Sequence, residues 1–151
     1  AVVLGRDARD VPAGQTRDYI FGYTILNDVS ARDVQTAHKQ WYFGKSLDGF
    51  TPIGPCIVTA DAFADYPPRL GIRSFVNGEK RQDSNTALQI FDIDHVIAEL
   101  SQGMTLKAGT IIATGTPAGV GMGMDPPQFL KPGDVVRCEI DGIGALTNPV
   151  K

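Results

Sequence analysis

Glycine and proline divide this chain into short segments. Seventeen glycines and ten prolines are spread over 151 residues, and runs rich in valine, isoleucine and threonine lie between them. Glycine favours turns, and proline has no backbone N–H to give to a strand ladder or a helix interior. Long helices therefore have little room. The pattern predicts one mixed, mostly β domain with few short helices over residues 1–151.

Two β-hairpins are the clearest strand pairs that the sequence predicts. In "LGIRSFVNGEKRQDSN", Asn77-Gly78 supplies the positive φ angles of a type I′ turn. In "DVVRCEIDGIGALTNPV" the chain folds back at Asp141-Gly142. Further strands are expected in "AVVLG", in "TIL" before Asn27, in "PIGPCIVT" and in "TIIA". The last of these leads into a long Gly/Pro loop.

One helix is expected in "FDIDHVIAELSQG". Asp92 is placed to cap its start and Gly103 to close its end, and His95 falls off the apolar stripe and should face solvent. The stripe itself has the i, i+3, i+4, i+7 spacing of one helix face and consists of Ile93, Val96, Ile97 and Leu100. A shorter helical turn is expected between Ser30 and Gln40.

Charge and hydropathy exclude several partner classes. Fourteen Lys and Arg stand against 17 Asp and Glu, for a formal net charge of −3, and no basic stripe could follow a phosphate backbone. No apolar run approaches the roughly 20 residues that cross a bilayer, and the first residues lack the charged-then-apolar order of a signal peptide. We therefore expect no nucleic-acid partner, no membrane partner and a cytoplasmic protein. Cys56 and Cys138 lie among apolar neighbours and are expected to be buried free thiols.

Familiar catalytic motifs are absent from the sequence. It has no G-x-S-x-G elbow, no Walker loop and no His/Cys cluster at zinc spacing. "GVGMGM" is followed by Asp125-Pro126-Pro127 where a dinucleotide motif needs a helix, so no nucleotide site is expected there. Three polar loops at expected strand ends remain: "NDVSARDVQ", "GKSLDGF" and "ATGTPAGVG".

Each polar candidate in these loops has a structural alternative. Asp28 is either an oxygen ligand for a hard cation or the cap of the following helix. Lys45 is either a movable positive charge in a site or a solvated loop lysine. Thr116, with glycine-freed backbone amides around it, is either part of an anion cradle or an ordinary threonine before proline. The residue types favour a site that combines a cation with an anionic substrate.

Four motifs follow one another along the chain: "GYTILNDVSARDVQ", "GKSLDGFTPIGP", "ATGTPAGVG" and "FLKPGDVVRCEIDGIGALTNPV". In this order they resemble the catalytic domain of the fumarylacetoacetate hydrolase family. The resemblance covers nearly the whole chain. It implies a β-roll domain that binds Mg²⁺, or Mn²⁺ or Ca²⁺, and acts on 2-oxo acids or 1,3-dicarbonyl compounds. It also implies a homodimer, for which the aromatic group Trp41, Tyr42 and Phe43 is a candidate contact.

The resemblance also implies a role for each matching residue. Asp28 matches the family's metal-binding aspartate, and Lys45 matches its active-site lysine. Gln35 matches a glutamine that is both catalytic and substrate-binding, and Thr116 matches a substrate-contacting threonine. Arg32 matches an arginine of the substrate-binding motif. Neither histidine, His38 or His95, is expected to be the catalytic base.

The chain opens at Ala1, without methionine, directly in the strand-like "AVVLG". We expect the domain to be truncated at its N-terminus, because the family's Glu-x-Glu metal ligands and its water-activating His and Glu would lie upstream. The first functional expectation is metal-dependent hydrolysis of the C–C bond of an acylpyruvate through an enolate. The alternatives are decarboxylation or isomerisation of a 2-oxo acid, such as oxaloacetate or a homoprotocatechuate-pathway dioate, and an inactive binding or assembly module.

Overall fold

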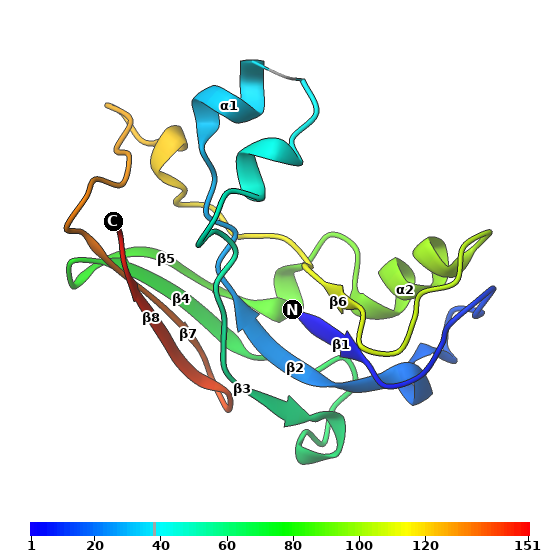
Figure 1. Cartoon of the computed structure of the whole chain (residues 1–151). Coiled ribbons are helices and arrows are strands. Elements are labelled where there is room, and N and C mark those ends of the chain that lie inside the picture. Colours follow the sequence, from blue (N-terminus) through cyan, green and yellow to red (C-terminus); the bar gives the residue numbers. More distant parts are fainter. Residues whose placement is uncertain (38) are drawn as a thin grey trace.

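The computed structural model describes residues 1–37 and 39–151, and over these residues the chain forms two four-stranded antiparallel sheets (Figure 1). The first sheet has the order β3-β2-β1-β6 and the second has the order β5-β4-β7-β8. The first consists of β1 (Val2–Leu4), β2 (Ile20–Leu26), β3 (Ile53–Thr59) and β6 (Ile111–Ile112). The second consists of β4 (Gly71–Val76), β5 (Glu79–Asn85), β7 (Val135–Ile140) and β8 (Gly144–Pro149). The mostly β fold class is confirmed.

The helical segments are short, as the spacing of glycine and proline predicts. The α-helices are α1 (Arg32–Ala37) and α2 (Ile93–Ser101). Single 3-10 turns are η1 (Thr16–Tyr19), η2 (Phe43–Lys45), η3 (Ala60–Ala62), η4 (Thr86–Leu88) and η5 (Gly121–Gly123). In Figure 1, α1, η2 and the loop that carries η5 project from one end of the sheets, whereas α2 lies away from them.

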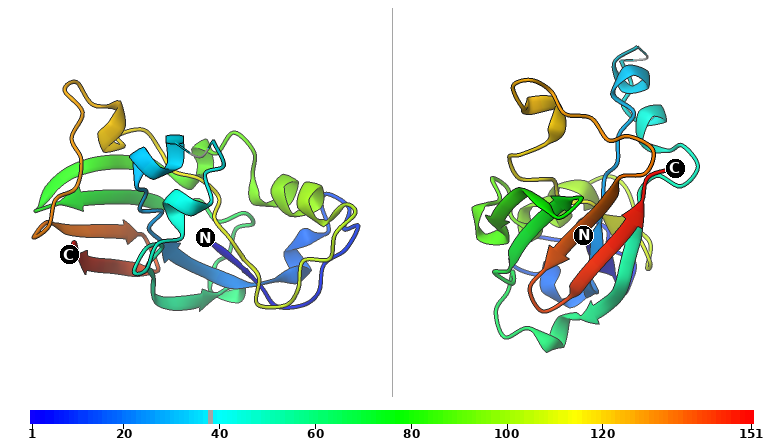
Figure 2. Two further views of the ribbon diagram at one scale, coloured as in Figure 1. Left: turned by 45° about the horizontal axis from the view of Figure 1, so that its top comes forward. Right: turned by 90° about the vertical axis from the view of Figure 1, so that its left-hand side faces the viewer.

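The two sheets meet along β3 and β8, which lie side by side in Figures 1 and 2. The thiol of Cys56 in β3 lies 3.7 Å from the carbonyl oxygen of Ile143, the residue before β8. A Cβ added at Gly54 would lie 3.6 Å from Leu146 Cδ1, so the two edge strands approach each other closely. The sheets therefore continue into one another as a roll.

The hydrophobic core fills the inside of this roll. Leu4 and Ile25 from the first sheet are 1% and 2% exposed, and Ile97 of α2 is 0% exposed. The second sheet and its last turn contribute Ile140 and Ile143 to the same cluster. Burial of such side chains from distant parts of the chain is the main free energy that holds the two sheets and α2 together.

The predicted helix is confirmed in bounds and caps. The Asp92 side chain accepts a hydrogen bond of 2.8 Å from the His95 backbone N–H, which caps α2. Gly103 follows the helix with a φ of 77°, and Ile93 and Ile97 are buried. His95 is exposed and stacks on Phe91, as expected for a residue off the apolar stripe.

Both predicted hairpins are present, and one of them is irregular. Asn77 and Gly78 have φ angles of 52° and 84°, as a type I′ turn requires. Along β4 and β5, Ser74 pairs with Gln82 but Phe75 pairs with Lys80, so the register skips Arg81. This β-bulge, which a regular alternating pattern does not predict, lies beside the Gly/Pro loop.

The prediction of two buried thiols is wrong for Cys56. Cys56 is exposed and Cys138 is partly buried, and both are free. The reason is that β3 is an edge strand whose side chains are largely open, with Ile57 45% exposed. Among the described residues no helix is long and apolar enough to span a membrane.

Candidate active site

The sheet topology brings the three polar loops to one edge. Both β2 and β6 pair antiparallel to β1, so β2 and β6 run in the same direction and end at the same edge of the sheet. Residues 27–31 follow β2, and residues 113–116 follow β6. Because β3 pairs antiparallel to β2, it begins at that edge, where residues 45–52 arrive. Figures 1 and 2 show these segments gathered at one end of the molecule.

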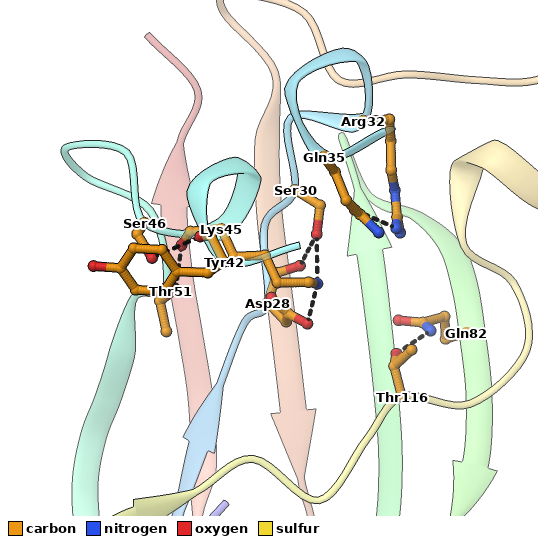
Figure 3. Close-up of polar contacts among 10 residues, drawn as sticks. All are labelled: Asp28, Ser30, Arg32, Gln35, Tyr42, Lys45, Ser46, Thr51, Gln82 and Thr116. Carbon is orange, nitrogen blue, oxygen red and sulfur yellow. Dashed lines mark hydrogen bonds and ion pairs between the residues drawn. The ribbon is translucent and has the colours of Figure 1, made fainter. Parts of the chain in front are cut away.

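Lys45 is held between Asp28 and Ser30 (Figure 3). Its Nζ donates to Asp28 Oδ2 at 2.5 Å and to Ser30 Oγ at 2.9 Å. Ser30 Oγ in turn donates to the Asp28 backbone oxygen at 3.1 Å, so the three residues form a closed group. The Lys45 side chain is 25% exposed and the Asp28 side chain is 43% exposed. The ammonium is therefore positioned by the protein and still reachable from solvent.

The backbone around Lys45 is fixed by the turn in which it lies. The Lys45 N–H donates to Tyr42 O at 3.1 Å, which closes η2, and Thr51 Oγ1 donates to Lys45 O at 3.0 Å. Thr51 has a φ of 57° and lies just before β3. The lysine therefore projects from an anchored turn rather than from a freely solvated loop.

Gln35 and Arg32 form a second group on α1. Arg32 Nη1 donates to Gln35 Oε1 at 3.0 Å, and Gln35 is 6% exposed. A Cβ at Gly44 would lie 2.8 Å from the Gln35 Cβ, and Ala31 N–H donates to Gly44 O at 2.8 Å. Only glycine at position 44 lets η2 pack this closely on α1. The packing couples Gln35 to the turn that carries Lys45.

Thr116 is held by a residue that sequence analysis missed. Gln82 Nε2 on β5 donates to Thr116 Oγ1 and to Pro117 O, each at 2.8 Å. In Figure 3 the side chains of Arg32 and Gln35 point toward the part of the site where Gln82 and Thr116 lie. Ser30 lies within the motif "NDVSARDVQ", so the sequence indicated it. Nothing in the sequence indicated Gln82, because its role depends on the β-bulge.

The structure therefore places the five predicted site residues in three groups at one edge. Asp28 and Lys45 are in direct contact, Arg32 contacts Gln35, and Thr116 is tied to Gln82. The alternative role of Asp28 as the cap of α1 is not what the structure shows, because its carboxylate pairs with Lys45. His38 lies outside the described residues.

The metal expectation can be compared with the oxygen ligands present. In the part of the chain that the structure describes, no group of three His, Cys, Asp or Glu side chains is placed to hold a metal ion. Asp28 contributes one carboxylate to the site, and one of its oxygens already accepts from Lys45. Hard cations such as Mg²⁺ or Ca²⁺ require several oxygen ligands. The described residues do not fit a metal site on their own.

Comparison with known proteins agrees with the motifs. Residues 1–151 match the family model of the fumarylacetoacetate hydrolase C-terminal domain. The chain is 48% identical over 150 residues to oxaloacetate tautomerase YisK of Bacillus subtilis, covering 99% of this chain and 50% of that protein. It therefore spans about half the length of this relative.

Two solved structures show the same fold. A fumarylacetoacetate hydrolase from Exiguobacterium antarcticum superposes with a TM-score of 0.96 at 51% identity, covering 99% of this chain and 53% of that one. A 2-hydroxyhepta-2,4-diene-1,7-dioate isomerase from Mycobacterium marinum superposes with a TM-score of 0.86 at 47% identity, covering 98% and 54%. Relatives that are similar to this degree carry both isomerase and hydrolase names.

Proposed function

Because this chain belongs to the fumarylacetoacetate hydrolase family, we propose that it is the catalytic domain of an enzyme that isomerises a small 2-oxo acid between its keto and enol forms. The similarity to an oxaloacetate tautomerase and to a dioate isomerase supports this alternative over C–C bond hydrolysis, our first expectation. The observation that carries the proposal is the Lys45 ammonium, held by Asp28 and Ser30 at the edge where Gln35 and Arg32 also lie.

Lys45 is the proposed proton carrier. When an enol becomes a ketone, carbon 3 of the substrate gains a proton and the oxygen on carbon 2 loses one. Lys45 Nζ carries protons on a flexible four-carbon stem, so it can give one to carbon 3 and take one back from the enol hydroxyl. No net proton is consumed. Asp28 and Ser30 keep Nζ in place between these transfers.

Gln35 and Arg32 are the proposed groups that bind and orient the substrate. The bond from Arg32 Nη1 occupies Gln35 Oε1, so the Gln35 amide presents its N–H donors. Such donors stabilise the negative charge that develops on the oxygen of carbon 2. Arg32 keeps further N–H donors in a fork that suits a carboxylate.

A divalent cation, Mg²⁺ or Mn²⁺ or Ca²⁺, remains part of the proposal. When bound, it would supply Lewis-acid polarisation of the substrate's 2-oxo and carboxylate oxygens. Asp28 is this chain's candidate ligand, and the other ligands would have to come from outside the described set.

A homodimer also remains a proposal: Trp41 and Tyr42 are 64% and 78% exposed, and aromatic side chains are enriched in subunit contacts. Light scattering on the intact protein would test it. Cytoplasmic location stays a prediction.

The deciding experiment supplies enol oxaloacetate to the intact protein with Mg²⁺ and follows two quantities. The enol is measured by ultraviolet absorbance, and total oxaloacetate by reduction with NADH and malate dehydrogenase. A tautomerase speeds the loss of enol while the total is conserved. A falling total of oxaloacetate indicates a decarboxylase. In a separate assay that supplies an acylpyruvate, cleavage of this substrate indicates the hydrolase. If the protein changes no reaction rate in either assay, the inactive module is indicated.

Two substitutions of Lys45 separate proton transfer from charge. Lys45→Met removes both, whereas Lys45→Arg keeps the charge but cannot give up a proton. If Lys45 carries the proton, kcat falls by about 100-fold or more in both variants. Activity restored by arginine would show that Lys45 contributes only its charge.

A further inference from the structure

The β-bulge in the β4–β5 hairpin turns two consecutive side chains toward the same loop. Neighbouring residues of a regular strand point to opposite faces of a sheet, and a bulge can re-aim one of them. Here the register skips Arg81, and both Arg81 and Gln82 contact the loop of residues 113–130. Arg81 Nη1 donates to Gln128 Oε1, and Gln82 donates to Thr116.

The orientation of the Gln82 amide follows from its partners. A backbone carbonyl oxygen can only accept, so the group 2.8 Å from Pro117 O is the amide nitrogen. The opposite atom, Oε1, can only accept, and Ser74 Oγ donates to it at 2.8 Å. A hydrogen-bond chain with one direction therefore runs from Ser74 through Gln82 to the loop.

This direction determines what the Thr116 hydroxyl can do. Gln82 Nε2 has no free lone pair, so Thr116 Oγ1 is the acceptor in their contact of 2.8 Å. The hydroxyl hydrogen of Thr116 is then left for another partner, and the Thr116 side chain is exposed at the site edge. An atom that meets this hydrogen must be an acceptor.

We propose that Gln82 is a positioning residue that makes Thr116 a hydrogen-bond donor to a carboxylate oxygen of the substrate. A carboxylate carries only acceptors, and hydrogen bonds to an ionised acceptor are about twice as strong as neutral ones. Arg32, whose side chain points toward this part of the site in Figure 3, adds positive charge for the same group. The inference rests on the proposed function in taking the ligand to be a 2-oxo acid.

The test measures binding of malonate, an unreactive dicarboxylate, by calorimetry of the intact protein at one fixed Mg²⁺ concentration. Thr116→Val removes the donor, and Gln82→Met removes the partner that orients it, so each should weaken malonate binding by about tenfold. The double variant should bind no more weakly than Thr116→Val alone, because Gln82 acts through Thr116. Thr116→Ser should keep the affinity.

Gln128→Met is the matched control. Gln128 is also a glutamine tether of residues 113–130, through Arg81, but it does not contact Thr116. Its replacement should leave malonate binding unchanged. An equal loss of malonate affinity in Gln128→Met would show that Gln82 merely anchors the loop, and this would overturn the inference. Multiplicative losses of affinity in the double variant, or no malonate binding by the unaltered protein, would overturn it as well.

The proposed function fails separately from this inference. If malonate binding depends on Thr116 and Gln82 as expected while enol oxaloacetate is not converted, the donor role stands and the tautomerase proposal falls.

Discussion

Asp28 has two roles open to it in this fold, and both use its carboxylate oxygens. Its contact with Lys45 at 2.5 Å holds the ammonium, while the family resemblance implies a metal ligand. The two roles are compatible, because a carboxylate has two oxygens with about four acceptor positions. The Asp28 side chain is 43% exposed, so the ion pair alone contributes little to the stability of the fold.

The metal role of Asp28 can be isolated by Asp28→Asn, which keeps the size and removes the charge. Mg²⁺ affinity of the intact protein should fall by about tenfold or more, equivalent to ~1.4 kcal/mol. The thermal midpoint should change little. The control is Asp33→Asn, which makes the same charge change in the first turn of α1. Calorimetric titration that gives the same Mg²⁺ affinity for Asp28→Asn and the unaltered protein would reduce Asp28 to a partner of Lys45.

Individual site residues were predictable where the motif itself carried the chemistry. The motifs predicted five site residues, and the fold brings all five to one edge of the sheet: Asp28, Arg32, Gln35, Lys45 and Thr116. Their partners were less predictable. A hydrogen bond from a strand residue to a loop 34 positions away depends on the strand register, and the register depends on a bulge.

At the scale of elements, local patterns predicted α2 and both hairpins, because caps, turns and apolar periodicity act over a few residues. The error on Cys56 arose at this scale as well. An apolar run such as "PIGPCIVT" has the same composition in a central strand and in an edge strand, and only the sheet order decides which it becomes. The bulge at Arg81 was missed for a similar reason, since the residues that contact it come from a loop distant in the sequence.

That packing predicts unequal effects of alanine at two glycines of the same loop. Gly115 and Gly119 have similar φ angles of 103° and 106°. A Cβ at Gly115 would meet nothing within 4 Å, whereas a Cβ at Gly119 would lie 2.1 Å from Arg81 O. Gly115→Ala should lower the free energy of unfolding by about 1 kcal/mol from backbone strain alone. Gly119→Ala should cost ~1–3 kcal/mol more because the loop must move off β5.

Urea unfolding of the two variants measures this difference. Equal losses would mean that residues near Gly119 shift without cost and that the loop is not held tightly on the bulge.

For the whole molecule, the sequence predicted the mostly β class and the family, but not how the two sheets join at β3 and β8. That contact is between segments about 90 residues apart, and no local pattern encodes it. Polar contacts between residues distant in the sequence also attach the segment that leads into β2. Thr16 is 0% exposed, and its hydroxyl contacts Tyr66 as well as Asp94 on α2.

The hydrogen bonds to Asp94 predict that this residue makes the stability of the fold depend on pH. Thr16 Oγ1 donates to its Oδ1 at 2.5 Å, and Gly14 N–H donates to its Oδ2 at 2.6 Å. Burial raises the pKa of the Asp94 carboxyl, but the hydrogen bonds from Thr16 and Gly14 outweigh burial and leave the pKa below its usual value. A pKa that is lower in the folded state gives stability that is present above the unfolded pKa of about 3.9 and is lost as the pH falls through the folded pKa.

The contribution of Asp94 to the free energy of unfolding should therefore be nearly constant above about pH 5 and decrease below about pH 4. Asp94→Asn should be less stable near neutral pH by about 1 kcal/mol or more, because an amide offers one acceptor where the carboxylate offers two. Its further loss of stability on acidification should be smaller than that of the unaltered protein, because position 94 no longer binds a proton. Asp18→Asn is the control. The Asp18 side chain is 82% exposed, and its ion pair with Arg6 at 3.8 Å is a surface contact that contributes little to stability. Urea unfolding at a series of pH values gives the free energy of unfolding of all three proteins. Parallel curves of this free energy against pH for Asp94→Asn and the unaltered protein would show that other carboxylates cause the acid sensitivity.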